Sequence, residues 1–165
     1  AEVYVANTDG TDPKNVSQDS AVDELASLSA DGSKVAWESF RNGNWEVYVA
    51  NTDGSGLVNV SADAGVDTGP SLSADGSKVA WCSPRTGKDE VYVAKADGTG
   101  TPVNVSNHSG ARDLSPSISA DGRTVAWDSD RDGNENVYIA STNGAWPARV
   151  TGNEGDHYYA SLQGN

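Results

Sequence analysis

Short runs of alternating apolar and polar residues recur along the chain at a nearly constant interval. One run, Leu72-Ser73-Ala74-Asp75-Gly76-Ser77-Lys78-Val79-Ala80-Trp81, appears nearly unchanged at residues 28–37 and 118–127. A second run, Glu-Val-Tyr-Val-Ala or a close variant, begins at residues 2, 46, 90 and 136, which gives spacings of 44, 44 and 46 residues. Because side chains alternate between the two faces of a strand, both runs predict short β-strands.

Each complete repeat contains four predicted strands, which we call a, b, c and d in chain order. Asp-Gly turns such as Asp31-Gly32 and Asp53-Gly54 separate the strands, as is typical of hairpins. The predicted strands are residues 25–29, 34–39, 46–50 and 57–61, then 70–73, 78–83, 90–94 and 102–106, then 116–119, 124–129, 136–140 and 148–151. The chain opens with strands at 2–6 and 14–17 and closes with an a-type strand at 158–163.

The repeat predicts an all-β fold, a β-propeller built of four-stranded antiparallel blades, because short strands with a period of about 40–45 residues are typical of propeller blades. About four repeats are represented in a single domain of residues 1–165, and one blade is incomplete. The repeats fall at about 1–18, 19–61, 62–106, 107–151 and 152–165.

A b strand is missing from the blade that the two ends of the chain would share. Three interpretations follow: a fragment of a longer propeller, a four-bladed ring with one defective blade, or open strand edges that pair with another copy. The missing strand favours the first and third of these over an unaided closed ring.

Composition restricts the classes of partner. The net charge of −13 disfavours a nucleic-acid partner and an anionic membrane surface, which both require clustered Lys and Arg. The single cysteine, Cys82, excludes an internal disulfide, and its place after a strand Trp indicates an incidental thiol. No run is long enough to span a membrane, and no signal-peptide pattern opens the chain, which begins in mid-repeat like a mature or trimmed product.

The order of the motifs resembles the TolB-type β-propeller repeat, a WD-like family found in periplasmic and secreted bacterial proteins. The matching segments are Pro70-Ser71-Leu72-Ser73-Ala74-Asp75-Gly76, Val79-Ala80-Trp81-Cys82-Ser83, Arg85-Thr86-Gly87, Val91-Tyr92-Val93 and Asp97-Gly98. Two positions depart from the family pattern: Leu or Ile replaces the aromatic residue of strand a, and Ala replaces the Pro before Asp-Gly. The resemblance implies an extracytoplasmic platform for protein interactions and implies no reaction.

One b–c loop is a candidate calcium site. Its oxygen-bearing residues alternate and a Gly stands at the sixth position, as in the first half of a calcium loop. The candidate ligands are Asp128, Asp130, Asp132, Asn134 and Asn136. The twelfth position, which would need a bidentate Glu, is Ile139, and the alternative interpretation is an acidic hairpin.

Two further sets of residues are candidates for binding. Asp23, Asp67, Asp113 and Asp156 precede the a strands, and the family resemblance places such residues on loops at one mouth of the channel. There they could bind cations or a basic peptide, or cap neighbouring backbone. Trp45, Trp146, Tyr158 and Tyr159 do not follow the repeat, so we expect them in a surface contact or an end-cap.

Other recurring residues are expected to serve the fold. Asp31, Asp75 and Asp121 fit turn chemistry, and Arg41, Arg85 and Arg131 fit ion pairs or stacking contacts between blades. The repeated Trp and Tyr residues fit a core between blades. His108 and His157 lie in different repeats, and their spacing does not indicate zinc.

The sequence therefore favours a non-catalytic, extracytoplasmic protein-interaction or assembly module that self-associates through incomplete blade edges. No nucleophile elbow, phosphate loop or isolated acid–base pair stands apart from the repeat. Two alternatives remain: an accessory propeller of a larger hydrolase or peptidase, and a propeller that binds carbohydrate with Ca²⁺. We expect no nucleic-acid partner and no membrane insertion.

Overall fold

A computed structural model describes residues 1–152 and 155–162 of the chain. Its regular elements are strands, and over the described residues it contains no helix that could cross a membrane. The strands are β1 (Tyr4–Val5), β2 (Lys14–Asn15), β3 (Asp23–Leu28), β4 (Lys34–Ser39), β5 (Glu46–Asn51), β6 (Val58–Asn59), β7 (Thr68–Leu72), β8 (Lys78–Ser83), β9 (Glu90–Lys95), β10 (Val103–Asn104), β11 (Asp113–Ile118), β12 (Thr124–Ser129), β13 (Asn136–Ser141) and β14 (Ala148–Arg149).

The strands form three complete blades and one hairpin, which confirms the predicted all-β fold. β3–β6, β7–β10 and β11–β14 are four-stranded antiparallel sheets, which we call the first, second and third blades. β1 and β2 pair as an N-terminal hairpin and occupy the c and d positions of a further blade.

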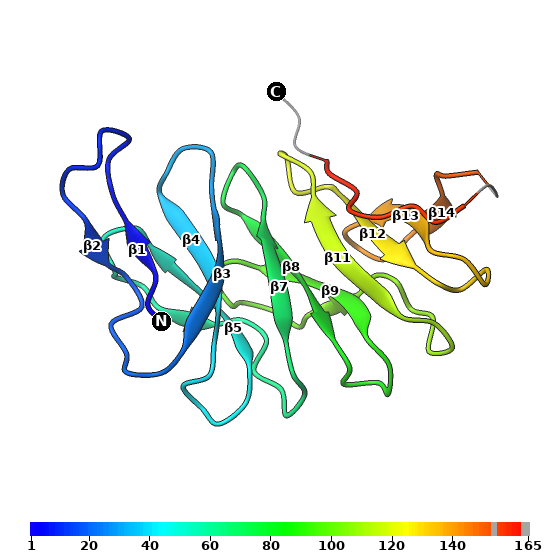
Figure 1. The fold of residues 1–165 in the computed structure, drawn as a ribbon, viewed down its shortest axis with the longest axis horizontal. Helices are drawn as coiled ribbons and strands as arrows, with labels where there is room; N and C mark the ends of the chain where they lie inside the picture. Colours follow the sequence, from blue (N-terminus) through cyan, green and yellow to red (C-terminus); the bar gives the residue numbers. More distant parts are fainter. Residues whose placement is uncertain (153–154, 163–165) are drawn as a thin grey trace.

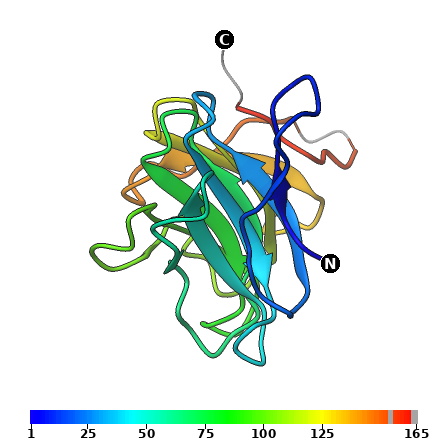
Figure 2. The same ribbon diagram turned by 90° about the vertical axis from the view of Figure 1, so that its left-hand side faces the viewer.

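The blades stand side by side in an open arc (Figure 1). The N-terminal hairpin and the third blade lie at opposite ends of the longest axis, so the sheets do not close into a ring in this structure (Figure 1). Figure 2 looks along the row from the hairpin end and shows the sheets one behind another, each twisted, as propeller blades are.

The central strand of each blade is buried on both faces because neighbouring blades cover it. In the second blade Val79, Ala80 and Trp81 are all inaccessible to solvent, although their side chains alternate between the two faces of β8. One core cluster joins Ala36 and Val47 of the first blade to Trp81 of the second. A blade therefore buries its apolar faces by stacking, as the repeat predicted.

Every a strand of the three complete blades contains a β-bulge that the sequence pattern did not predict. The register of β7 against β8 shifts between Thr68 and Ser71, and the intervening Gly69 has a φ of 65°. The a strands of the first and third blades have the same shift, with Leu25 and Ser115 at positive φ. With the bulge included, the a strands begin earlier than predicted. The d strands are shorter than predicted and contain two residues each.

The predicted C-terminal strand at 158–163 is not a strand over residues 158–162, and residue 163 lies outside the described residues. The segment nevertheless follows the course of an a strand. Leu162 donates its backbone N–H to Ser117 Oγ at 2.9 Å, as Ile118 does to Ser71 Oγ at 3.2 Å. Tyr159 also has a positive φ of 62°, at the position of the bulge. Among the described residues no b strand pairs with the segment, so the ladder that defines a strand is missing.

Candidate functional site

One buried ion pair recurs in every complete blade. In the second blade Asp67 Oδ1 accepts hydrogen bonds from Trp81 Nε1 at 3.3 Å and from Arg85 Nη2 at 3.1 Å. The Arg85 guanidinium also lies over the ring of Tyr92, 4.4 Å from its centroid. The corresponding groups are Asp23, Trp37, Arg41 and Tyr48 in the first blade and Asp113, Trp127, Arg131 and Tyr138 in the third. The expectation that the repeated Trp and Tyr residues serve packing is confirmed, whereas the Arg residues form their ion pairs and stacking contacts within a blade and not between blades as expected.

The predicted position of three acidic residues was wrong. Asp23, Asp67 and Asp113 are not on exposed loops, since they are buried where the a strands begin. Burial, the largest contribution, raises the pKa of Asp67 despite the neighbouring guanidinium. Carboxylates that are buried and already paired cannot meet a cation or peptide from solution, so the structure assigns them to the blade core.

The fourth member of that predicted set, Asp156, does not occupy the same position in its repeat. His157 donates its N–H to the carbonyl oxygen of Glu135, as Asp113 does to Asp89 in the preceding repeat. His157 therefore takes the place of the buried Asp. Asp156 is exposed, and its Oδ1 accepts the backbone N–H of Glu135 at 3.3 Å.

The predicted calcium ligands are occupied by protein groups. Asp132 Oδ2 accepts hydrogen bonds from Tyr138 and, at 3.1 Å, from Arg149. Asp130 Oδ1 accepts the backbone N–H of Arg112 at 2.8 Å. These partners lie on different elements and draw the two carboxylates apart.

The remaining candidate ligands described below are also bonded to groups of the protein. Asp128 is buried in β12, and its Oδ2 accepts the backbone N–H of Tyr159 at 3.0 Å. Asn136 donates to the carbonyl oxygen of Asn134 at 3.0 Å. Over residues 1–152 and 155–162, no three His, Cys, Asp or Glu side chains are grouped to hold a metal ion. Calcium binding by this loop stays a prediction, and it would require the loop to rearrange.

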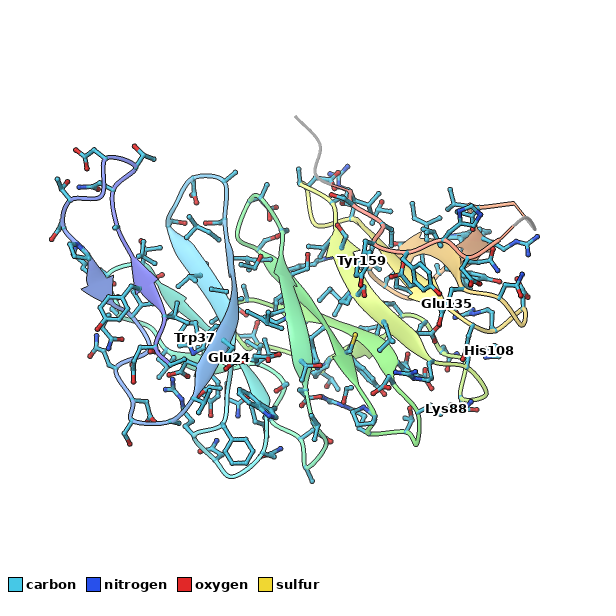
Figure 3. The ribbon with its side chains drawn as sticks, in the orientation of Figure 1. Glu24, Trp37, Lys88, His108, Glu135 and Tyr159 are labelled. Carbon is cyan, nitrogen blue, oxygen red and sulfur yellow. The ribbon has the colours of Figure 1, made fainter. Side chains whose placement is uncertain are left out.

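The aromatic residues outside the repeat divide into two kinds. Trp146 is 85% exposed and Tyr159 is 82% exposed, and Tyr158 is also exposed. Trp45 is half-buried, and its ring lies edge-on to Phe40 at 5.5 Å. Figure 3 shows Tyr159 near Glu135 beside the third blade. Three of the four are thus exposed, and their role in a surface contact stays a prediction.

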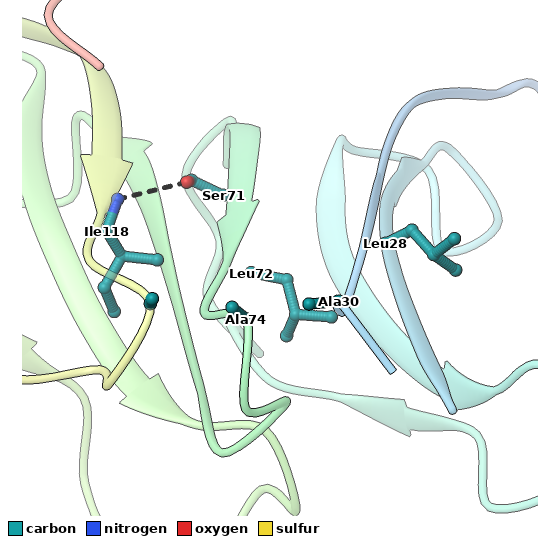
Figure 4. A pocket seen from close by; sticks show the side chains of 7 residues that line it. Leu28, Ala30, Ser71, Leu72, Ala74 and Ile118 are labelled. Carbon is teal, nitrogen blue, oxygen red and sulfur yellow. Dashed lines mark hydrogen bonds between the residues drawn. The ribbon is translucent and has the colours of Figure 1, made fainter. Parts of the chain in front are cut away.

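A groove runs along the ends of the innermost strands (Figure 4). Its cavity measures about 190 Å³. The turns on either side are joined by backbone hydrogen bonds, such as Ala30 N–H to the carbonyl oxygen of Ala74 at 2.9 Å. The lining residues are Leu28, Ala30, Ser71, Leu72, Ala74, Ile118 and Ala120. Apart from Ser71, these are the strand-a residue and the turn alanine of each blade, so the positions that depart from the family pattern line the groove.

The first blade has an uncovered apolar face. Leu28 is 52% exposed, whereas Leu72, the same position in the second blade, is 6% exposed. The hairpin supplies only c- and d-type strands, so no described residue stands where an a–b pair would cover Leu28. Tyr4 is also exposed, at 60%, but on the opposite side of the hairpin, because Val3 and Val5 are the hairpin residues that pack on the first blade. A depression of about 650 Å³ lies between the hairpin and the first blade.

Cys82 has none of the properties of a nucleophile. The side chain is buried, and burial raises the pKa of its thiol to about 12, so the thiol is protonated at neutral pH.

Comparison with known proteins gives a family and a fold. The family model described as the TolB beta propeller domain matches residues 1–164. No curated protein matches the chain. The structure resembles TolB from Acinetobacter baumannii, with a TM-score of 0.73 and 21% identity over 96% of this chain and 39% of that one. It also resembles a puromycin-hydrolyzing peptidase from Mycobacterium tuberculosis, with a TM-score of 0.70 and 22% identity over 93% of this chain and 26% of that one.

A third similar structure is a nidogen/laminin complex, with a TM-score of 0.60 and 16% identity over 87% of this chain and 54% of that one. The chain thus spans about half or less of the length of the solved structures it matches. At these identities the structural likeness establishes the fold, and the match of the family model over nearly all of the chain establishes the family. The chain belongs to the TolB beta propeller domain family.

Proposed function

We propose that the chain is a non-catalytic protein-interaction or assembly module that works outside the cytoplasm. The observation that carries the proposal is the uncovered apolar face of the first blade. Leu28 is exposed there although Leu72, its counterpart in the second blade, is a core residue, and it lines a depression together with Val5 and Ala6 of the hairpin. Exposed apolar surface of this kind is typical of contact surfaces. The family match supports the location, because TolB proteins are periplasmic.

The partner for this face that the blade geometry favours is a second copy of the chain. The second and third blades each stack their a strand on the a strand of the preceding blade, so the chain already presents surfaces shaped to stack on one another. The hairpin also leaves the edge of β1 unpaired among the described residues, and unpaired strand edges promote association.

Self-association predicts that the purified chain sediments as a dimer or larger species, with a mass that rises with concentration. Leu28→Asp should shift it to the monomer, because a charge would then have to be buried in the contact. Leu57→Asp is the matched control, since Leu57 is similarly exposed but lies next to the outermost strand of the blade. Analytical ultracentrifugation measures both. A strict monomer at high concentration, or equal effects of the two variants, would contradict the proposal.

A second candidate function is an accessory propeller in a larger hydrolase. It is favoured by the similarity to the puromycin-hydrolyzing peptidase, of which the chain spans 26%. In that case the inner groove would face a catalytic domain encoded in the same gene, and the sequence of the parent gene decides between the two candidates.

The calcium-dependent carbohydrate-binding function remains the weaker alternative. The carboxylates of the candidate loop are occupied by Arg149 and by backbone N–H groups, which compete with an ion. Isothermal titration calorimetry with Ca²⁺ tests this function directly, and the absence of a heat of binding would exclude it.

A further inference from the structure

The unpaired cations of the chain are concentrated in one place. Seven of the eleven Lys and Arg residues lie within 4.0 Å of a carboxylate. The other four, counted against the carboxylates that the structure describes, are Lys34, Lys78, Lys88 and Lys95. Three of these four line a single depression of about 460 Å³ between the first and second blades. We call it the lysine groove.

Neutral oxygens hold two of the amines in place. Lys34 Nζ donates to Asn51 Oδ1 at 3.2 Å, and Lys78 Nζ donates to Thr142 Oγ1 at 2.6 Å. Such bonds orient an ammonium group and leave its charge without a counter-charge in direct contact. Lys95 is exposed at the end of β9, where the sister strands carry Asn51 and Ser141. Because the other blades do without it, the packing of a blade does not require this lysine.

Two carboxylates share the lysine groove but are directed into their own turns. Asp75 Oδ1 accepts the N–H of Ser77 at 2.9 Å, and Asp97 Oδ1 accepts the N–H of Thr99 at 2.8 Å. The lining thus carries three positive and two negative charges. This alternation favours a ligand with separated carboxylates over a compact, highly charged anion.

An apolar depression adjoins the lysine groove. It measures about 250 Å³, shares Lys78 and Lys95 with the groove, and is lined by the partly exposed Ala94 and Val103. A ligand that reaches both depressions would place a small aliphatic side chain on Ala94 and Val103 and carboxylates on the amines. A peptide offers that combination, whereas an acidic polysaccharide lacks the aliphatic side chain.

We propose that the lysine groove and the adjoining depression bind an extended acidic peptide segment in which carboxylates flank small aliphatic side chains. The net charge of −13 repels such a segment from the rest of the surface and so limits binding to this place. This contact is separate from the uncovered face of the first blade, and its binding does not depend on self-association.

The test uses the isotope-labelled full chain and a synthetic decapeptide of alternating Glu and Val. Saturable shifts of backbone amide signals are expected at Lys78, Lys95 and Val103. Replacing all three groove lysines by Gln should weaken binding by about threefold to a hundredfold, because each exposed charge pair contributes a modest and roughly additive share. The matched control is Lys88→Gln, which removes the fourth unpaired lysine. Lys88 lies at the opposite end of the blades, near His108 (Figure 3).

The single variant Lys95→Gln tests binding in a chain that should still fold, since Lys95 makes no salt bridge to the described residues. It should weaken binding by about twofold to fivefold with an otherwise unchanged spectrum. The same peptide with Gln in place of Glu should not bind. The proposal is overturned if no saturable shifts appear, if the Gln peptide binds equally well, or if Lys88→Gln weakens binding as much as Lys95→Gln.

Discussion

Replacing Trp81 with alanine should lower the free energy of unfolding by about 3–5 kcal/mol, the usual cost of removing a large buried aromatic side chain. Trp81 is inaccessible to solvent, stacks on Tyr92 with ring centroids 6.2 Å apart, and belongs to the core between the first two blades. A domain of this size is stabilised by about 5–15 kcal/mol in total, so the variant should be close to unfolding at 25 °C.

Urea denaturation followed by circular dichroism measures this loss without relying on tryptophan fluorescence. The matched control is Trp146→Ala, which truncates the same kind of side chain at an exposed site and should change stability by less than about 0.5 kcal/mol. Equal losses in the two variants would show that the core between the blades is not where the stability resides.

Replacing Arg85 with methionine should cost about 3–5 kcal/mol at pH 7, because it leaves the buried Asp67 carboxylate without its counter-charge. Arg85 is 15% exposed and Asp67 is fully buried. Methionine keeps part of the contact with Tyr92, so most of the loss should be electrostatic. Adding Asp67→Asn should recover much of the stability, since no uncompensated charge then remains.

The same variant should show a characteristic dependence on pH. Burial raises the pKa of Asp67 above its unfolded value, so its favourable contribution is complete below the unfolded pKa and is lost as the pH rises through the folded one. Removing Arg85 raises the folded pKa further, so the difference from the parent chain should shrink as the pH falls from 7 towards 4.

Arg123→Gln is the control for this pair, because its partner Asp121 is also exposed and surface pairs contribute little. Chemical denaturation over the pH series measures both variants. A loss below about 1 kcal/mol for Arg85→Met, or a loss independent of pH, would contradict a structural role for the buried pair.

The blade repeat could be predicted from the sequence because its spacing and alternation are determined by backbone geometry. The b and c strands of the complete blades appear where the runs predicted them, and Asp31, Asp75 and Asp121 cap their turns through side-chain oxygens. The first of these caps holds the pKa of Asp31 at about 2, chiefly through the backbone N–H of Ser33.

The buried role of Asp23, Asp67 and Asp113 could not be read from local sequence, since an Asp before a strand also fits an exposed loop. A signal was present at longer range, because each Asp stands fourteen residues before the Trp that donates to it. Counting back five residues from Leu162, as from Leu72 to Asp67, gives His157 instead of Asp156.

The bulge of the second blade and the lysine groove involve contacts between blades, and such contacts leave no local pattern. Gly69 donates its N–H to Glu38 of the preceding blade, which stabilises the bulge from outside its own strand. The groove lysines come from two blades and from three different strands. The sequence carries a signal for one of them that the sequence analysis did not use, since Lys95 stands where the sister strands have Asn51 and Ser141.

Hydrogen–deuterium exchange resolved by residue tests most directly whether each blade owes its stability to its neighbours. The amides of β8 and β9, which have a blade on either side, should exchange slowest, and those of β1 and β2, with a neighbour on one side, should exchange fastest. If β1 and β2 were protected as strongly as β8 and β9, the stacking of blades on one another would not be the source of their stability.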